Sequence, residues 1–126
     1  MQGVDPATNT LVQDPQTRIR QAFLNIRLIA QSEGASLQDC VRLTVYVSDL
    51  HRFAPMVDKV QAELWSKPPY PPRTMVEIQR LFDDDIVEID SIFLCLGEKV
   101  SRTLRRRTAR RRVAASLPHE VPPMLR

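Results

Sequence analysis

Two charged side chains have sequence neighbours that would suit them for chemistry on a small organic acid. Arg73 stands where a proline-rich run, residues 66–72, ends and an apolar run begins. A guanidinium held between a stiff loop and a strand can bind a carboxylate through two parallel, charge-assisted hydrogen bonds. Glu88 lies between two apolar residues of a later run, so its carboxylate, a group able to accept protons, faces away from them. Structural roles stay open for both: Arg73 could form an ion pair, and Glu88 could lie on the exposed face of an edge strand.

Two helices should help to position these residues. Apolar residues at helical spacing predict helices over residues 15–33 and 51–65. Asp14, followed by proline, suits the N-cap of the first helix, and Ser48 or Asp49 suits that of the second. Each helix therefore has an apolar stripe that must be buried against another element.

Strands are indicated by alternation of apolar and polar residues, rich in β-branched side chains. The expected strands are residues 41–47, 74–79 and 86–94, with a short one at 11–12. Because the order is (β)–α–β–α–β–β, the fold class expected is α+β, a two-layer sandwich of a mixed β-sheet with two helices on one face. A chain of 126 residues suits a single core of this kind.

Charge is divided unevenly along the chain, whose formal net charge is +3. Residues 99–126 hold nine Lys or Arg and one acidic residue, which gives +8, whereas residues 1–98 hold nine and fourteen, which gives −5. We therefore expect a folded domain, residues 1–98, and a basic, arginine-rich, disordered tail, residues 99–126. Arginine blocks can neutralise phosphates, but no aromatic residues interleave with them, so specific binding of nucleic acid is not expected.

Several other classes of protein are disfavoured by the sequence. Cys40 and Cys95 match no zinc or redox spacing, and both are expected to be reduced core residues. No metal site is expected, because neither histidine has a partner at ligand spacing. No apolar run is long enough to span a bilayer, and no secretory signal is visible, so the expected location is the cytoplasm.

Three segments resemble those of the Rid (YjgF) family. Residues 4–8 (VDPAT) look like the family's turn after its opening strands, and residues 36–50 (SLQDCVRLTVYVSDL) are similar to its SL-D-V-K-T-V-Y-L-D-L segment. Residues 72–78 (PRTMVEI), followed by residues 87–90 (VEID), resemble the family signature. The three occur in the family's order and spacing over most of residues 3–95, so the chain is identified as a member by resemblance.

The resemblance implies a fold, an assembly and an activity. The fold would be YjgF-like and the assembly a homotrimer with clefts between subunits. The activity would be hydrolysis of enamines and reactive 2-imino acids to 2-keto acids and ammonia, without a cofactor. Arg73 would bind the substrate carboxylate, the backbone groups of Thr74 and Met75 would line the site, and Glu88 would handle the proton. Many relatives carry cysteine where Met75 stands. Because methionine has no thiol, a nucleophilic sulfur is excluded at this position of the chain.

One departure from the family keeps a second function open. Relatives begin with a strand pair before the first matching segment, so this domain is expected to be N-terminally truncated. A non-catalytic, trimeric protein that binds small carboxylates or regulates another is therefore the alternative. Tyr46 and Trp65 could flank the cleft but suit core or subunit packing better, and Glu77 is expected to be structural.

Overall fold

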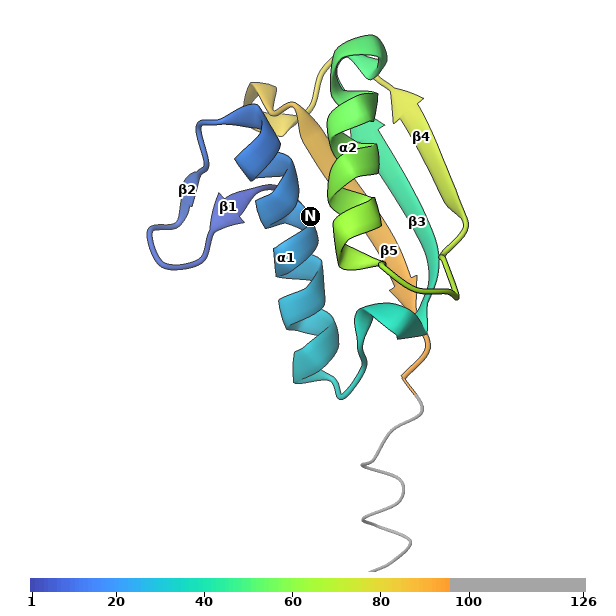
Figure 1. Ribbon diagram of the computed structural model, residues 1–126. Coiled ribbons are helices and arrows are strands. Elements are labelled where there is room, and N and C mark those ends of the chain that lie inside the picture. The colour runs from blue at the N-terminus through green and yellow to red at the C-terminus, as the bar shows by residue number, and fades with distance from the viewer. Residues whose placement is uncertain (96–126) are drawn as a thin grey trace, which may run out of the picture. The chain divides into compact units, whose positions relative to one another are not determined.

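The computed structural model describes residues 1–95, in which two helices pack on one face of a mixed β-sheet (Figure 1). A small hairpin of two short strands lies beside the first helix. The elements in chain order are β1 (Val4–Asp5), β2 (Thr10–Leu11), α1 (Pro15–Ser32), β3 (Cys40–Val47), α2 (Leu50–Leu64), β4 (Arg73–Glu77) and β5 (Val87–Phe93), with 3₁₀ turns at Leu37–Asp39 and Phe82–Asp84.

The main sheet has the order β4–β3–β5, with β3 in the centre. β4 runs parallel to β3, because the chain crosses over through α2 between them, and β5 runs antiparallel to β3. Both helices cover the same face of the sheet (Figure 1). The predicted α+β sandwich with a mixed sheet is therefore confirmed.

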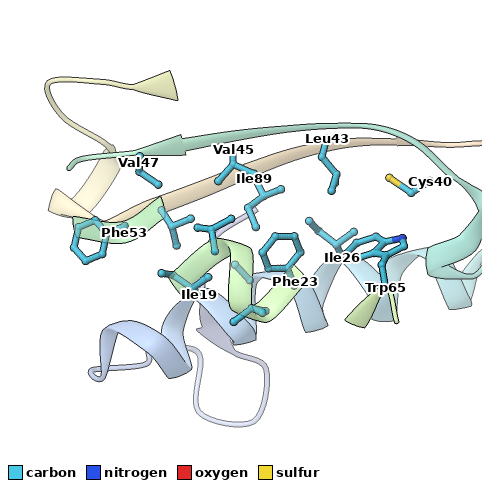
Figure 2. Packing of buried hydrophobic residues seen from close by; sticks show 14 of the residues in the cluster. Ile19, Phe23, Ile26, Cys40, Leu43, Val45, Val47, Phe53, Trp65 and Ile89 are labelled. Atoms are coloured by element: carbon cyan, nitrogen blue, oxygen red, sulfur yellow. The ribbon is translucent and has the colours of Figure 1, made fainter. Parts of the chain in front are cut away.

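The core lies between this sheet and the two helices (Figure 2). Alternate residues of β3 point toward the helices and are fully buried: Leu43, Val45 and Val47. Trp65, just after α2, is only 1% exposed; its indole nitrogen donates to the Leu37 carbonyl at 2.8 Å. The indole also meets the Phe23 ring edge-on, with the centroids 5.9 Å apart. Trp65 thus links α1, α2 and the turn before β3, which agrees with its predicted role in packing.

Carboxylates cap both helices. The hydroxyl and backbone N–H of Thr17 donate to Asp14, the N-cap of α1, and hold the pKa of its carboxyl below the ordinary value. Asp49 caps α2. Glu77 of β4 accepts a further bond from the Leu50 backbone N–H at 2.9 Å. Since the first N–H groups of a helix lack partners within it, these contacts stabilise both starts. Glu77 therefore ties α2 to β4, which is a structural role.

The first residues are fastened to α1 and β5. The Asn25 side-chain amide donates to the carbonyls of Gln2 and Val4, at 3.1 and 2.7 Å. Met1 and Ile89 exchange two backbone hydrogen bonds. Strand β1 was not expected, because a two-residue strand is too short to show alternation and its neighbours are turn residues.

The longer elements begin and end within two residues of their predicted limits. The expectation for Cys40 is confirmed: it is buried, and burial raises the pKa of its thiol. The expectation for Cys95 is wrong, because this residue follows the end of β5 and is exposed. The predicted domain limit at residue 98 and the basic tail, residues 99–126, lie outside the described residues.

A buried ion pair closes the end of the sandwich near the hairpin. The Arg18 Nη1 atom lies 3.2 Å from Oδ1 of Asp85, whose side chain is fully buried. Asp85 Oδ1 also accepts from the Ile86 backbone N–H, and Arg18 Nε donates to the Val12 carbonyl. The pair links α1 to the segment before β5, and neither partner can lose the other without leaving a buried charge.

We expect Trp65→Phe to lower the free energy of unfolding by about 1–3 kcal/mol, because the Leu37 carbonyl would stay buried without its donor. The measurement is urea unfolding followed by circular dichroism. Tyr70→Phe, at a side chain exposed to solvent, is the matched control and should leave the midpoint nearly unchanged. Equal midpoints for the two variants would contradict a structural role for the indole N–H.

We expect Arg18→Met to cost about 3–5 kcal/mol of stability, because it leaves the Asp85 carboxylate buried and unpaired. Replacing both partners, as Arg18→Met with Asp85→Leu, should restore part of the loss, since no buried charge then remains. Thermal and urea unfolding of the two variants would test this. A double variant that is no more stable than the single one would show that the charge is not the cause.

Candidate functional site

Arg73 is the first residue of β4, and its side chain points to the helical side of the sheet. Its aligned residue in β3 is Leu43, which lies buried beneath the helices, and aligned residues of neighbouring strands share a face. Arg73 Nη1 lies 2.7 Å from Asp58 Oδ1 and donates to Gln61 Oε1 at 2.8 Å. The ion pair that the sequence left open for Arg73 therefore exists, with a partner on α2.

Asp58 and Gln61 were not identified from the sequence. They lie about one turn apart on the polar side of α2 and look there like ordinary solvated residues. No spacing rule links a helix position to the first residue of a later strand. Only the parallel pairing of β3 with β4 brings α2 over Arg73.

A hollow of about 340 Å³ opens at this contact. Its walls come from the end of α2, the loop that follows, and β4; the residues are Asp58, Gln61, Ala62, Trp65, Ser66, Tyr70 and Arg73. The loop is the predicted proline-rich run, and Tyr70 within it is exposed. The hollow thus combines one cation, one anion, an amide and two hydroxyl groups beside an aromatic wall.

The guanidinium is engaged on one side only. Nη1 carries two hydrogens, and its two partners are Asp58 and Gln61. Within residues 1–95, neither Nε nor Nη2 has a hydrogen-bond partner. These two atoms form a parallel pair of donors, which matches the two oxygens of a carboxylate. Since the Arg73 side chain is 26% exposed, this free edge is a candidate carboxylate-binding group.

Glu88 lies on the opposite face of the sheet from Arg73. It is aligned with Tyr46 of β3, while its neighbours Val87 and Ile89 are buried on the helical side. Its side chain is 41% exposed, and Oε1 lies 3.8 Å from the Met1 ammonium group. One chain therefore does not bring Glu88 and Arg73 together.

Thr74 and Met75 take different positions. Thr74 is aligned with Thr44, so its side chain lies on the face away from the helices, whereas Met75 packs partly buried against the core. Pro72, just before β4, and Ile78, just after it, both form backbone hydrogen bonds with β3. Because alternate residues of a parallel strand bond to the neighbouring strand, the even-numbered residues of β4 bond to β3. The backbone groups of Met75 thus point to the free edge of the strand, while those of Thr74 are used within the sheet.

The sheet face that carries Glu88 is not covered by any described element. Exposed and half-buried residues lie there in register on three strands; among them are Thr44, Tyr46, Thr74, Val76, Glu88 and Asp90. Tyr46 therefore lies away from the helices and away from the Arg73 hollow. An uncovered sheet face with apolar side chains is typical of a surface that binds another protein chain.

Neither a metal site nor a membrane-spanning helix is found in this part of the chain. In residues 1–95, no three His, Cys, Asp or Glu side chains gather where they could hold a metal ion. The two helices there are too short or too polar to cross a membrane.

Known proteins are similar to this chain in sequence and fold. Residues 2–95 match the family described as Endoribonuclease L-PSP. A RutC family protein of Pyrococcus horikoshii is 38% identical over 71% of this chain and 70% of its own length. A 2-iminobutanoate/2-iminopropanoate deaminase of Salmonella typhimurium is 33% identical over the same shares.

Solved structures agree with these relatives. The crystal structure of RidA from an Antarctic Psychrobacter is 34% identical and superposes with a TM-score of 0.70, over 75% of this chain and 76% of that one. The two comparisons, together with the family match over almost all described residues, confirm the resemblance seen in the three sequence segments. The chain belongs to the Rid (YjgF) family, whose model carries the description Endoribonuclease L-PSP.

Proposed function

We propose that this protein hydrolyses reactive enamines and 2-imino acids in the cytoplasm, with Arg73 as the carboxylate anchor. The free Nε–Nη2 edge of Arg73, a residue that lines a hollow of a small molecule's size, is the observation that carries the proposal. Relatives at 33% and 30% identity are named 2-iminobutanoate/2-iminopropanoate deaminase. In the proposed reaction, a protonated 2-imino acid and water give a 2-keto acid and an ammonium ion, so atoms and charge balance.

Glu88 is proposed to handle the proton of the attacking water. Its carboxylate would accept that proton as the C–O bond forms and return it to the nitrogen as the C–N bond breaks. Because the iminium carbon is already electrophilic, the mechanism needs no nucleophilic side chain, which agrees with Met75 in place of cysteine. The backbone groups of Met75 at the strand edge would orient the substrate. The Thr74 hydroxyl lies on the same sheet face as Glu88, so it would contact the substrate from the Glu88 side of the site.

The proposed site is assembled between copies of the chain. Arg73 and Glu88 lie on opposite faces of one sheet, so one small ligand meets both only if they come from different subunits. The uncovered sheet face supports this, since a closed homotrimer would bury it. Each site would then take Arg73 from one subunit and Glu88 from the next.

A non-catalytic carboxylate-binding protein is the second candidate. The contact between Arg73 and Asp58 favours it, because part of the guanidinium charge is already neutralised within the chain. Such a protein would bind 2-keto acids and leave the decay rate of an imine unchanged.

We expect Arg73→Ala to slow hydrolysis of 2-iminobutanoate by about 100-fold, since two charge-assisted hydrogen bonds to the substrate are lost. Arg73→Lys keeps the charge without the two parallel donors and should lose about tenfold. The imine can be generated with a threonine dehydratase and its decay followed. Arg27→Ala, at an exposed position of α1, is the control; decay as fast with Arg73→Ala as with wild type would disprove the anchor.

We expect Glu88→Gln to lower the turnover rate by about 100-fold or more while 2-oxobutanoate still binds. Glu63→Gln, the same substitution at an exposed position of α2 that does not line the hollow, is the matched control and should keep its activity. Refolding Glu88→Gln together with Arg73→Ala should restore about a quarter of the wild-type activity, because each mixed trimer contains one intact site. No recovery in the mixture would contradict a site shared between subunits.

A further inference from the structure

Strand β5 has one edge that the main sheet leaves open. In the order β4–β3–β5, β5 bonds to β3 on one side only. Even-numbered residues near its two ends, Ile86 and Leu94, form backbone hydrogen bonds to β3 or to the residues that flank it. The N–H and C=O groups of Ser91 and Phe93 therefore point outward, and within residues 1–95 they have no partner. Such a row of unpaired groups is a template for a further strand.

Met1 already occupies one place on this edge. Its nitrogen donates to the Ile89 carbonyl at 2.8 Å, and its carbonyl accepts from the Ile89 N–H at 2.9 Å. This exchange of both bonds between one pair of residues is the pattern of antiparallel strands. Toward the end of β5, the next places of the same kind are at Ser91 and Phe93. A strand added there would follow the direction and register that Met1 sets.

An apolar hollow of about 370 Å³ lies beside the open places, between α1 and β5. Its walls include Ile26, Ile29 and Ala30 of α1, Ser91 and Phe93 of β5, and Met1. Ser91 and Phe93 are aligned with Leu43 and Cys40, which are buried beneath the helices. Because aligned residues of neighbouring strands share a face, the residues paired with Ser91 and Phe93 in an added strand would point to the hollow.

Charge favours a basic segment of another protein over a second copy of this chain. The charged side chains that line the hollow, Glu33 and Asp90, are both acidic. A second β5 strand would bring the same carboxylates to the contact, so like charges would meet there. Lys or Arg residues on an added strand would bring the opposite charge.

We propose that the open edge of β5 and the hollow beside it bind an extended, basic segment of another protein as an antiparallel strand. The segment exchanges backbone hydrogen bonds with Ser91 and Phe93, and the residues that it pairs with them are apolar. Past Ser91 the segment leaves the edge, because Met1 occupies the next place. This surface lies at the opposite edge of the sheet from β4, so the proposal does not depend on Arg73 or on the deaminase function.

The peptide Lys-Val-Thr-Ile-Lys, with a rhodamine label at its amino end and an amide at its carboxyl end, is the probe. Its Val would pair with Phe93 and its Ile with Ser91, while the N–H of the Thr between them points away from β5. Fluorescence anisotropy with the full chain should give a dissociation constant on the order of 100 μM. Glu in place of both Lys residues of the probe should weaken binding about fivefold.

Methylation of single peptide nitrogens tests the strand pairing and leaves the protein unaltered. A methyl group on the Ile nitrogen removes the donor to the Ser91 carbonyl and should weaken binding about tenfold. The same change on the Thr nitrogen, which faces solvent, is the matched control and should stay within about twofold. Equal effects of the two methyl groups would overturn the proposal.

Variants of the protein test the same contact from the other side. Ser91→Pro removes an N–H that faces the open edge, where proline is tolerated, and should weaken binding about tenfold. Ile29→Asp puts a charge at the hollow and should weaken binding about fivefold. Leu28→Asp is the control, because Leu28 is 55% exposed against 53% for Ile29 but does not line the hollow.

The remaining outcomes all count against the proposal. A probe that does not bind at about 1 mM protein would overturn it. So would equal losses of affinity in Ile29→Asp and Leu28→Asp, which would separate binding from the hollow. Sedimentation that shows self-association of the chain, abolished by Ser91→Pro and unaffected by the probe, would assign the edge to a second copy instead.

Discussion

The guanidinium of Arg73 is held at one nitrogen and left open at the other two, and everything proposed for the site depends on this division. Asp58 and Gln61 fix Nη1, which orients the flat group at the end of β4. The Nε–Nη2 edge then stays available in a fixed direction. A preorganised pair of donors loses little conformational freedom on binding, which suits recognition of a small ligand with few other contacts.

The fold keeps α2 and β4 at the spacing that this contact needs. Glu77 at the end of β4 accepts a hydrogen bond from the start of α2. At the other end of the helix, Trp65 is buried and bonded to the Leu37 carbonyl. Because both ends of α2 are tied to the sheet side of the molecule, Asp58 and Gln61 between them cannot move far from Arg73. The core thus determines the geometry of an exposed site.

The spacing of apolar and polar residues along the chain predicted most of this fold but little of the site. Periodicity located both helices and the three longer strands, because each has a regular apolar stripe or alternation. The helices, β3 and β5 bury that face in the core, whereas β4 packs only Met75 partly against it. It could not locate β1, which is too short to alternate, or the exposed position of Cys95 past the end of β5. Arg73 was identified from its neighbours. Asp58 was not, because its role depends on a strand crossover that brings distant residues together.

The relation between Arg73 and Glu88 shows the same limit at the level of assembly. Alternation correctly placed Glu88 opposite its buried neighbours, but only the strand register shows that Arg73 faces the other way. A crystal structure of the protein with 2-oxobutanoate is therefore the most direct measurement. We expect the ligand carboxylate within hydrogen-bond distance of Arg73 Nε and Nη2, with Asp58 still on Nη1. A ligand bound elsewhere, or one that displaces Asp58 from Nη1, would contradict the claim that Nη1 is held within the chain while Nε and Nη2 bind the ligand.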